Sequence, residues 1–396
     1  MLLTARARRR KTPCMESLDR FAAEKLADLE SKKLRRTLHD DARTDGLWIE
    51  RNGRRLLSFS CNDYLNLTHD PRVKAAAKSA VDAFGAGAGA SRLVTGNHPL
   101  LSELEAKLAA FKGTEAACVF GSGYLTNAGV IPSLVRGGDI LFVDELAHAC
   151  MWAGARLSDA RVCVFNHNDL DDLEAYLKKE RARFDRAMVV TETVFSMDGD
   201  LAPIQKLSEL CAAHDAWLLT DDAHGLGVVN DGRGGACGVS PTVPLQMGTL
   251  SKALGSYGGY LCASQTVIDF IKTRARTLIF TTGLPPASVA AALKSLEIIE
   301  SDPELTRKPI DNARRFTRAL NLPDAQSAVV PVILGEPERA LNAAAALQEQ
   351  GFLVAPIRPP TVPEGTARLR VAFTAGHSAA DIDRLAEAVR TIMATP

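Results

Sequence analysis

The sequence predicts an α/β protein with a mainly parallel central sheet covered by helices on both faces, followed by a smaller α+β C-terminal domain. Three observations carry this prediction. From about residue 65 to residue 300, short apolar runs alternate with segments of helical periodicity, as in a sheet that is buried on both sides. The apolar runs are followed by glycine or small polar residues, where strands turn into helices. The chain has 396 residues, which is enough for two or three domains.

The N-terminal region is expected to form a helix and a hairpin. Leu18, Phe21 and Leu29 recur at helical spacing, which predicts an amphipathic helix over residues 16–38. The stretch LWIERNGRRLLSFS comes next, and its Asn52-Gly53 pair favours the tight turn of a β-hairpin.

Seven short strands are expected in the large domain, at the runs AACVF, ILFVD, ARVCVF, RAMVVT, AWLLTD, VPLQMG and YLCAS. A smaller unit begins near Asp302-Pro303. Its last helix starts with Ser378 and Asp381, which have the spacing of a capping box. The expected division is an N-terminal segment, a large domain and a small C-terminal domain, over residues 1–64, 65–300 and 301–396 respectively.

The composition argues against several classes of protein. Lysine plus arginine equal aspartate plus glutamate at 47 each, so no net field favours nucleic acid or an acidic membrane. No apolar run approaches the ~20 residues that cross a bilayer. The eight cysteines form no C-x-x-C pair and mostly sit in apolar segments, which is typical of buried thiols in the reducing cytoplasm.

The first residues, MLLTARARRRK, are rich in arginine and lack acidic side chains. A transit peptide and a nucleic-acid-binding tail share that composition. A plain extension, or a start upstream of the true one at Met15, also accounts for it. We expect no nucleic-acid and no membrane partner.

Polar residues follow several of the apolar runs, and ligands of open parallel sheets bind beyond the carboxyl ends of the strands. The run AWLLTDDAHG ends in Asp221, Asp222 and His224. Such a group could hold a metal, form a hydrolytic pair or bind a cation, or it could cap a helix beside a solvated acid. A metal site would need further ligands at suitable spacing, and GLGVVNDGRGG supplies few.

A candidate anion site lies in VFGSGYLTN, where Gly121, Ser122 and Gly123 stand between a strand and a helix. Free N–H groups at a helix N-terminus bind phosphate. The Gly-Lys-Ser/Thr ending of a Walker loop is missing. The run GAGAGAS over residues 85–91 contains G-x-G-x-x-A, but the segment before it has a helical pattern, so nicotinamide binding is not expected.

Lys252 stands among small residues in MGTLSKALGSYGGY, directly after an apolar run. A lysine amine becomes a useful nucleophile where its site favours the neutral form and lets a carbonyl approach. Pyridoxal phosphate needs such a lysine, an acid for its pyridine nitrogen and a cradle for its phosphate. Lys252, Asp221 and the Ser122-Gly123-Tyr124 turn supply all three from different strand ends. His148, in ELAHACMW, could stack on the ring or fill a place in the core.

Eight motifs of the chain occur in a recognisable order: SCNDYLNL, GSGYLTN, ELAHA, VFSMDGDLAP, TDDAHGLG, GTLSKALG, TTGLPPAS and IRPPTVPEGTARLRVAF. In these motifs the chain resembles the α-oxoamine synthases, over nearly everything from residue 16 to the end. The resemblance implies fold type I of the pyridoxal-phosphate enzymes, and a homodimer with its active site at the subunit interface. It also implies the reaction: an amino-acid Cα carbanion attacks an acyl thioester, and the β-keto acid then loses carbon dioxide.

The resemblance also implies a role for each site residue. Lys252 would hold the cofactor as an imine and move the Cα proton, and Asp221 would pair with the pyridinium nitrogen. The other implied cofactor contacts are His224 and Ser196 at the ring oxygen, His148 on the ring face, Ser122, Gly123, Tyr124 and Thr249 around the phosphate, and Thr282 from the partner subunit. The implied substrate contacts are Asn62 and Arg370 at the amino-acid carboxylate, and Arg35 in KKLRRTL, where neighbouring Arg36 leaves the register open.

The branch of the family is indicated by Ser91-Arg92-Leu93. The aminolaevulinate branch usually has Thr-Arg-Asn there, and leucine cannot donate the hydrogen bond that the asparagine gives to the succinyl carboxylate. The stretch SRLVTGNHPL instead resembles the branch of biotin biosynthesis, which implies L-alanine and a pimeloyl thioester carried by coenzyme A or by a carrier protein. The alternatives are a sister enzyme that condenses glycine with a short acyl-CoA, and a non-catalytic module. Asn66 and Thr193 replace the usual small residues near the expected site, which leaves substrate preference open.

Overall fold

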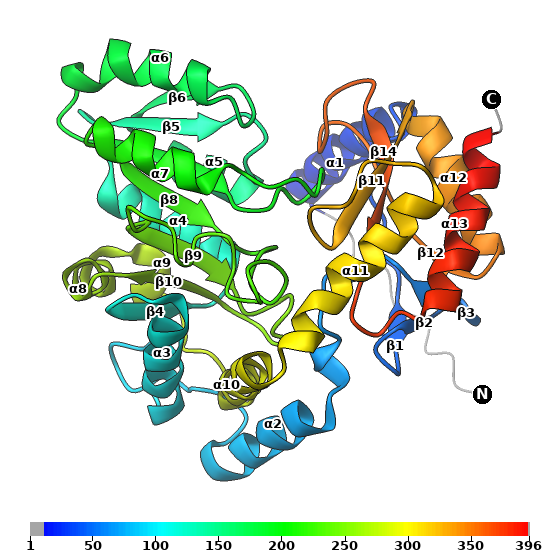
Figure 1. Cartoon of the computed structure of the whole chain (residues 1–396), viewed down its shortest axis with the longest axis horizontal. Helices are drawn as coiled ribbons and strands as arrows, with labels where there is room; N and C mark the ends of the chain where they lie inside the picture. Colours follow the sequence, from blue (N-terminus) through cyan, green and yellow to red (C-terminus); the bar gives the residue numbers. More distant parts are fainter. Residues whose placement is uncertain (1–11, 395–396) are drawn as a thin grey trace.

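The computed structural model describes residues 12–394, and these form a large and a small domain side by side (Figure 1). The predicted α/β architecture is confirmed. All seven predicted runs are strands of one sheet, in the order β4-β10-β9-β8-β7-β5-β6. Their bounds are Ala116–Phe120 (β4), Ile140–Asp144 (β5), Arg161–Phe165 (β6), Ala187–Glu192 (β7), Trp217–Asp221 (β8), Leu245–Thr249 (β9) and Gly259–Ala263 (β10).

Six of the seven strands, β4, β9, β8, β7, β5 and β6, run in the same direction, and β10 runs antiparallel to its two neighbours, β4 and β9. Helices cover both faces. They are α2 (Pro71–Phe84), α3 (Pro99–Lys112), α4 (Gly123–Leu134), α5 (Ala149–Leu157), α6 (Leu170–Glu180), α7 (Ile204–Ala213), α8 (Gln265–Arg274), α9 (Arg276–Ile279) and α10 (Pro286–Ser301), with short 3₁₀ turns η1 (Leu67–His69) and η2 (Arg181–Arg183).

The two-residue period of the strands divides the core between these faces. On β4, Cys118 and Phe120 pack in one cluster with α4, α5 and α8, whereas Ala117 and Val119 pack in another with α3 and α10. A sheet buried on both sides needs apolar residues at every position, which is why the sequence shows continuous apolar runs rather than alternation. The segment before the GAGAGAS run is helix α2, as predicted.

The small domain is built from segments near both ends of the chain. The predicted hairpin is formed by β2 (Trp48–Arg51) and β3 (Arg54–Ser58), and Asn52 and Gly53 both have positive φ, as a type I′ turn requires. Strand β1 (Asp41–Arg43) pairs with β2, and β12 (Phe352–Leu353) pairs in parallel with β3. The remaining elements are α11 (Pro303–Ala319), β11 (Val329–Gly335), α12 (Pro337–Glu349), β13 (Ala355–Ile357), β14 (Ala367–Ala372) and α13 (Ala379–Ala394). One hydrogen bond of the predicted capping box is present at the start of α13, where Ser378 Oγ accepts from the Asp381 N–H.

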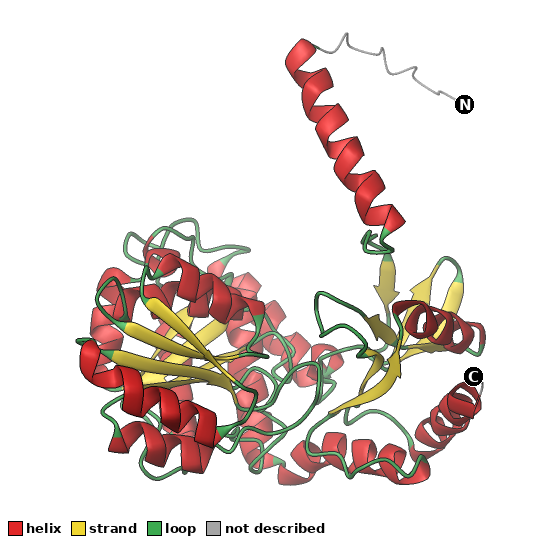
Figure 2. Ribbon diagram, turned by 90° about the horizontal axis from the view of Figure 1, so that it is seen from above, coloured by secondary structure: helices red, strands yellow, loops and turns green. Residues whose placement is uncertain are grey.

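The N-terminal helix α1 runs from Pro13 to Ser31, so the predicted helix over residues 16–38 ends earlier than expected. Lys33 adopts a positive φ of 55°, which the right-handed helix does not permit. Helix α1 stands away from both domains and has no buried side chain (Figure 2). The arginine-rich segment 1–11 lies outside the described residues. Within residues 12–394, no helix combines the length and apolar character that a bilayer crossing requires.

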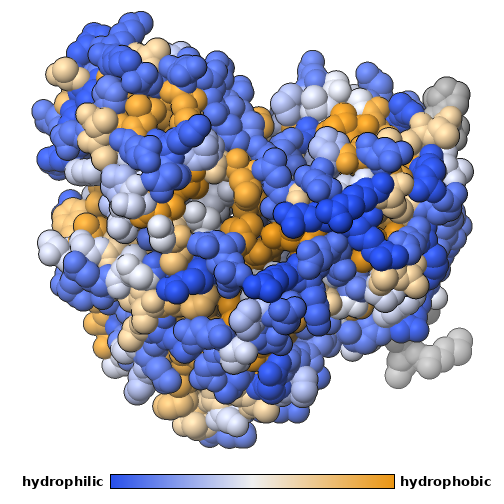
Figure 3. Space-filling view, in the orientation of Figure 1, coloured by the Kyte–Doolittle hydropathy of each residue, from blue (hydrophilic) through white to orange (hydrophobic). Residues whose placement is uncertain are grey.

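The carboxyl ends of β5, β7, β8 and β9 point towards the small domain, and the residues that follow these strands line the space between the two domains. The face seen in Figure 3 is largely hydrophilic, but apolar side chains gather along its middle, between the two halves. This is the edge of the sheet at which parallel-stranded proteins bind their ligands.

Candidate active site

Lys252 lies in the loop between β9 and β10, and its amine starts a chain of hydrogen bonds. Lys252 Nζ is 2.7 Å from His224 Nε2, and His224 Nδ1 is 2.5 Å from the hydroxyl of Tyr64. The Tyr64 hydroxyl donates in turn to Asn62 Oδ1 at 3.3 Å. The donor and acceptor roles along this chain are consistent if Lys252 Nζ donates to His224 Nε2 and His224 Nδ1–H donates to the Tyr64 hydroxyl oxygen. The side chains of Lys252, His224 and Asn62, predicted from separate motifs, therefore belong to one network.

The protonation states of this network follow from its burial. Removal from water lowers the pKa of Lys252 to about 8, although the negative charge of Asp221 opposes the shift. Burial, reinforced by the positive charge of Lys252, holds the pKa of His224 well below its ordinary value, so His224 is neutral. An amine that is partly neutral near physiological pH is a nucleophile and a base.

Asp221 ends β8, and its buried carboxylate has neutral partners only. Asn127 Nδ2 donates to Oδ2 at 2.8 Å, and the Ala223 N–H donates to Oδ1 at 2.9 Å. Burial raises the pKa of Asp221, while Lys252 acts in the opposite direction. A cation placed against this carboxylate would recover the cost of its desolvation. The protonated ring nitrogen of pyridoxal phosphate is such a cation.

The predicted anion site is the N-terminus of α4. Ser122 caps the helix, and its Oγ accepts from the Leu125 N–H at 3.2 Å. The N–H groups of the first turn have no partner within the helix, which makes the turn suitable for phosphate. A Cβ on Gly259 of β10 would lie 2.5 Å from the Ser122 carbonyl oxygen and 2.6 Å from the Gly123 nitrogen. The neighbouring strand thus leaves this backbone room only because residue 259 is glycine. Thr249, at the end of β9, is buried and donates to the Gly258 carbonyl oxygen at 2.8 Å, while Tyr124 is half exposed.

His148 caps α5, and its hydrogen bonds define its tautomer. Nδ1 accepts from the Cys150 N–H at 3.3 Å and lies 2.9 Å from Cys150 Sγ, so Nε2 carries the proton of the neutral ring. Burial lowers the pKa of His148, although the Asp221 charge opposes this. His148 and Ser196 both line a cavity of about 790 Å³. An aromatic ligand on the Asp221 side would meet a neutral imidazole.

Arg370, on β14, is a buried cation of the small-domain side. Nη1 donates to Asn62 Oδ1 at 3.1 Å and Nε donates to the Ser196 carbonyl oxygen at 2.5 Å. The guanidinium thus joins two other predicted site residues and is a suitable partner for a carboxylate. Of the two arginines in KKLRRTL, Arg36 lines the 790 Å³ cavity, whereas the exposed Arg35 pairs with Glu30 at 2.8 Å.

Thr282, like Arg35, stands apart from this network. It is exposed and forms an isolated β-bridge with Ser91. Among the described residues, no three or more His, Cys, Asp or Glu side chains are arranged to hold a metal ion. Asp222 is not a solvated acid, because it is fully buried against Lys112.

Three residues of the site were not singled out from the sequence: Tyr64, Asn127 and Glu192. Glu192 ends β7 directly beside Asp221 and is buried, with no hydrogen-bond partner for its Oε1. Burial and the Asp221 charge raise the pKa of Glu192 well above its ordinary value, so Glu192 is neutral. Tyr64 lies within the quoted motif SCNDYLNL, which was a usable signal. Asn127 lies one turn into α4, and its contact with Asp221 depends on the order of the strands.

The two departures from the family pattern are explained by their surroundings. Asn66 has a φ of 57°, a left-handed conformation that glycine adopts freely and asparagine tolerates. Thr193 Oγ1 donates to Asp222 Oδ1 at 2.6 Å and is buried. Neither side chain lines the cavity on which His148 and Ser196 open.

Comparison with known proteins gives a consistent result. Residues 54–389 match the family model described as aminotransferase class I and II. The chain is 62% identical over 381 residues to an 8-amino-7-oxononanoate synthase of Beijerinckia indica, covering 96% of this chain and 99% of the relative. It is 64% identical over 346 residues to an enzyme of the same name from Methylocella silvestris, covering 87% and 99%.

Solved structures include two informative neighbours. The serine palmitoyltransferase of Sphingomonas wittichii superposes with a TM-score of 0.89 at 32% identity, covering 96% of this chain and 98% of that one. The 8-amino-7-oxononanoate synthase of Francisella tularensis superposes with a TM-score of 0.73 at 25% identity, covering 85% and 98%. A related serine palmitoyltransferase structure contains pyridoxal phosphate as its internal aldimine.

Proposed function

This chain belongs to the class I and II aminotransferase family, and we propose that it condenses L-alanine with a pimeloyl thioester to give 8-amino-7-oxononanoate, carbon dioxide and the free thiol. Relatives about 60% identical over nearly the whole chain carry the name of that enzyme, which acts in biotin biosynthesis. Its cofactor is pyridoxal phosphate. The observation that carries the proposal is the convergence of Lys252, Asp221 and the N-terminus of α4 at one edge of the sheet.

The site fits the cofactor through residues already described. Bound pyridoxal phosphate supplies an electron-withdrawing ring that stabilises negative charge at the alanine Cα. Asp221 would keep the ring nitrogen protonated, because its buried carboxylate is stabilised by a cation. His148 would pack on the ring face, and Ser196 and His224 would bind the ring hydroxyl. The remaining contacts lie around the phosphate: Ser122, Gly123, Tyr124 and Thr249.

Proton transfer is the task of Lys252. Its pKa of about 8 lets the amine take a proton from the alanine Cα and return one to the product near neutral pH. Neutral His224 accepts a hydrogen bond from this amine, and Tyr64 holds the opposite ring nitrogen. The imidazole is thereby fixed in one orientation and one tautomer.

The substrates are held on the small-domain side. Arg370 and Asn62 bind the alanine carboxylate, which orients the Cα–H bond towards Lys252. The acyl chain occupies the cavity of about 790 Å³ beside His148 and Ser196. On its wall, Arg36 is a counter-ion for the distal carboxylate of the pimeloyl group.

We propose that the functional unit of the protein is a homodimer in the cytoplasm. On α1, Leu18 is 67% exposed and Phe21 is 58% exposed. A helix that buries no side chain in its own chain gains its stability by packing on a second copy. The exposed Thr282 is then available to the neighbouring site. The variant Leu18→Glu/Phe21→Glu should elute as a monomer in size-exclusion chromatography and lose activity, and an unchanged dimer would exclude α1 from the interface.

The decisive experiment is a substrate matrix. Purified protein is supplied with L-alanine, glycine or L-serine, and with pimeloyl, acetyl, succinyl or palmitoyl thioesters, and thiol release is measured. We expect turnover with L-alanine and pimeloyl-CoA or the pimeloyl carrier protein. Release with glycine and acetyl-CoA alone would overturn the proposal. Borohydride reduction followed by peptide mapping should place the cofactor on Lys252, and Lys252→Ala is the matched control without label.

A further inference from the structure

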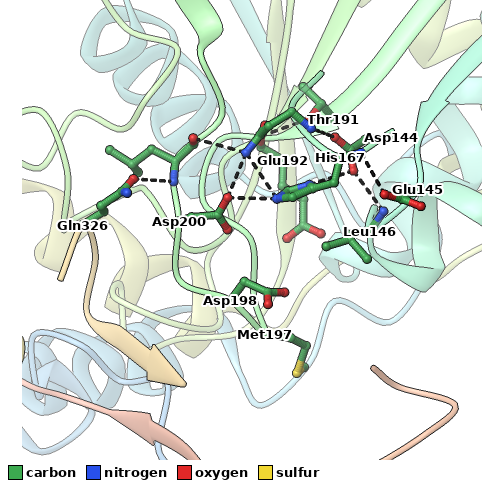
Figure 4. A network of polar contacts seen from close by, with 12 residues as sticks. Asp144, Glu145, Leu146, His167, Thr191, Glu192, Met197, Asp198, Asp200 and Gln326 are labelled. Atoms are coloured by element: carbon green, nitrogen blue, oxygen red, sulfur yellow. Dashed lines mark hydrogen bonds and ion pairs between the residues drawn. The ribbon is translucent and has the colours of Figure 1, made fainter. Parts of the chain in front are cut away.

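His167 lies between two carboxylates outside the network of Lys252. His167 Nδ1 is 3.1 Å from Asp144 Oδ1, and Nε2 is 2.9 Å from Asp200 Oδ2 (Figure 4). Its backbone N–H donates to Glu145 Oε1 at 3.0 Å, and its ring meets Phe195 edge to face, with the centroids 4.2 Å apart. Burial opposes a charge on this ring, but the hydrogen bonds to Asp144 and Asp200 outweigh it and raise the pKa of His167 to about 10. His167 is therefore a cation shared by two anions.

The two carboxylates belong to two segments whose neighbouring residues line the acyl cavity. Residues 145–149, which follow Asp144, contribute one part of the lining, and residues 195–198 contribute another. The second segment is a closed loop, because Val194 pairs with Leu201 and the Phe195 N–H donates to the Asp200 carbonyl oxygen at 3.0 Å. Asp200 thus anchors the base of the loop. His167 joins the segment that carries His148 to the segment that carries Ser196.

The loop is also tied to the small domain. Arg370 Nε donates to the Ser196 carbonyl oxygen, Arg368 pairs with Asp198, and the Leu201 N–H donates to Gln326 Oε1 at 3.0 Å. These contacts come from the side that holds the amino-acid carboxylate. On the large-domain side, the loop is held by His167 and by Asn168, whose Nδ2 donates to Asp200 Oδ2 at 2.8 Å. Loss of His167 therefore removes the charged contact between this loop and the large domain, while Arg370 remains in place.

Building on the proposed function, we propose that His167 is a positioning residue for the acyl donor: it sets the width of the cavity by clamping the loop of residues 194–201 to the end of β5. It touches neither the amino acid nor the reacting atoms. Its removal should weaken the binding of the thioester while the amino-acid half of the site keeps its geometry.

The test is a kinetic comparison of His167→Asn with the wild type. Asparagine is too short to span both carboxylates and carries no charge. We expect the KM for the pimeloyl thioester to rise at least tenfold, while kcat and the KM for L-alanine change less than threefold. The absorbance change that L-alanine alone produces in the cofactor-loaded protein should be unaffected. His377→Asn is the matched control. His377 is also a buried, doubly hydrogen-bonded histidine, but it lies in the small domain against Phe59 and should lower the melting temperature without a selective change in KM.

Asp200→Asn is the second variant and replaces His167→Asn if that variant does not fold. It weakens the contact of His167 with the loop and keeps the contact of His167 with Asp144. An unchanged KM for the thioester in the folded variants, or an equal rise of both KM values, would overturn the role of His167. If the wild type prefers another thioester, the proposed substrate is wrong, and the same comparison with the preferred thioester still decides the role of His167.

Discussion

Lys112→Met should lower the free energy of unfolding by about 3–5 kcal/mol, because it leaves a buried carboxylate without its cation. Lys112 is the last residue of α3, and its Nζ donates to Asp222 Oδ2 at 2.6 Å and to the Arg233 carbonyl oxygen at 2.7 Å. Both side chains of the pair have 0% exposure. Asp222 is further fixed by Thr193, and the segment around Gly234 packs on it so closely that a Cβ there would lie 1.6 Å from Oδ2. Water therefore cannot replace the lost amine without displacing backbone.

Urea unfolding of the cofactor-free variants measures this cost, with Lys107→Met as the control. Lys107 lies in the same helix and pairs with Glu300 at 2.6 Å, but the two side chains are 26% and 41% exposed. A pair of that exposure contributes below about 1 kcal/mol. The double variant Lys112→Met/Asp222→Asn removes both charges and keeps an amide that Thr193 can bind, so it should regain at least half of the loss. A loss below about 1 kcal/mol for Lys112→Met, or no recovery in the double variant, would refute the reasoning.

Three further predictions concern the cofactor site. Asp221→Asn should reduce activity at least 100-fold. It should leave the melting temperature of the cofactor-free protein equal or higher, because the raised pKa of Asp221 means that the buried, charged carboxylate costs stability at pH values above its ordinary pKa. A lower melting temperature would contradict this. Gly259→Ala should weaken cofactor binding at least tenfold in a titration, because its Cβ would meet the first residues of α4, while Gly87→Ala, with no atom within 4 Å, should bind normally. The rate at which cofactor-free protein takes up pyridoxal phosphate should rise with pH and level off above about 8, where the Lys252 amine is neutral, and a rate that keeps rising to pH 10 would exclude the lowered pKa.

The sequence is informative wherever a physical signal is local. Each of the seven strands was a continuous apolar run, and the turn at Asn52-Gly53 needed only the backbone freedom of those two residues. Lys252 and Asp221 were found because each follows such a run, and the carboxyl ends of parallel strands meet at one edge. Features that rest on long-range order were not predicted. The antiparallel direction of β10 and the parallel pairing of β3 with β12 depend on contacts between distant segments.

The residues that sequence analysis missed share this dependence. Asn127 lies in a helix whose own pattern gives no reason to mark an asparagine, and its contact with Asp221 joins residues 94 positions apart in the chain. Glu192 is the last residue of an apolar strand, where a buried acid is unexpected, and its proximity to Asp221 follows from the register of β7 and β8. His167 lies in a loop between β6 and α6, and its two carboxylate partners are 23 and 33 residues away in the chain.

The local surroundings of Asn66 and Thr193 indicate whether these two residues influence substrate preference. Each replaces a small residue close to the site, which left the acyl and amino-acid preference open at the level of sequence. Asn66 adopts a left-handed φ, which asparagine tolerates, and Thr193 donates a hydrogen bond to the buried carboxylate of Asp222. The cavity wall is built instead by the residues around His148, by the loop that His167 clamps, and by the proline-rich segment 359–364. Substitutions that alter preference for the acyl chain should therefore lie in that wall. Exchange of Asn66 or Thr193 for glycine should change the free energy of unfolding and leave the ratio of kcat/KM values between thioesters nearly unchanged.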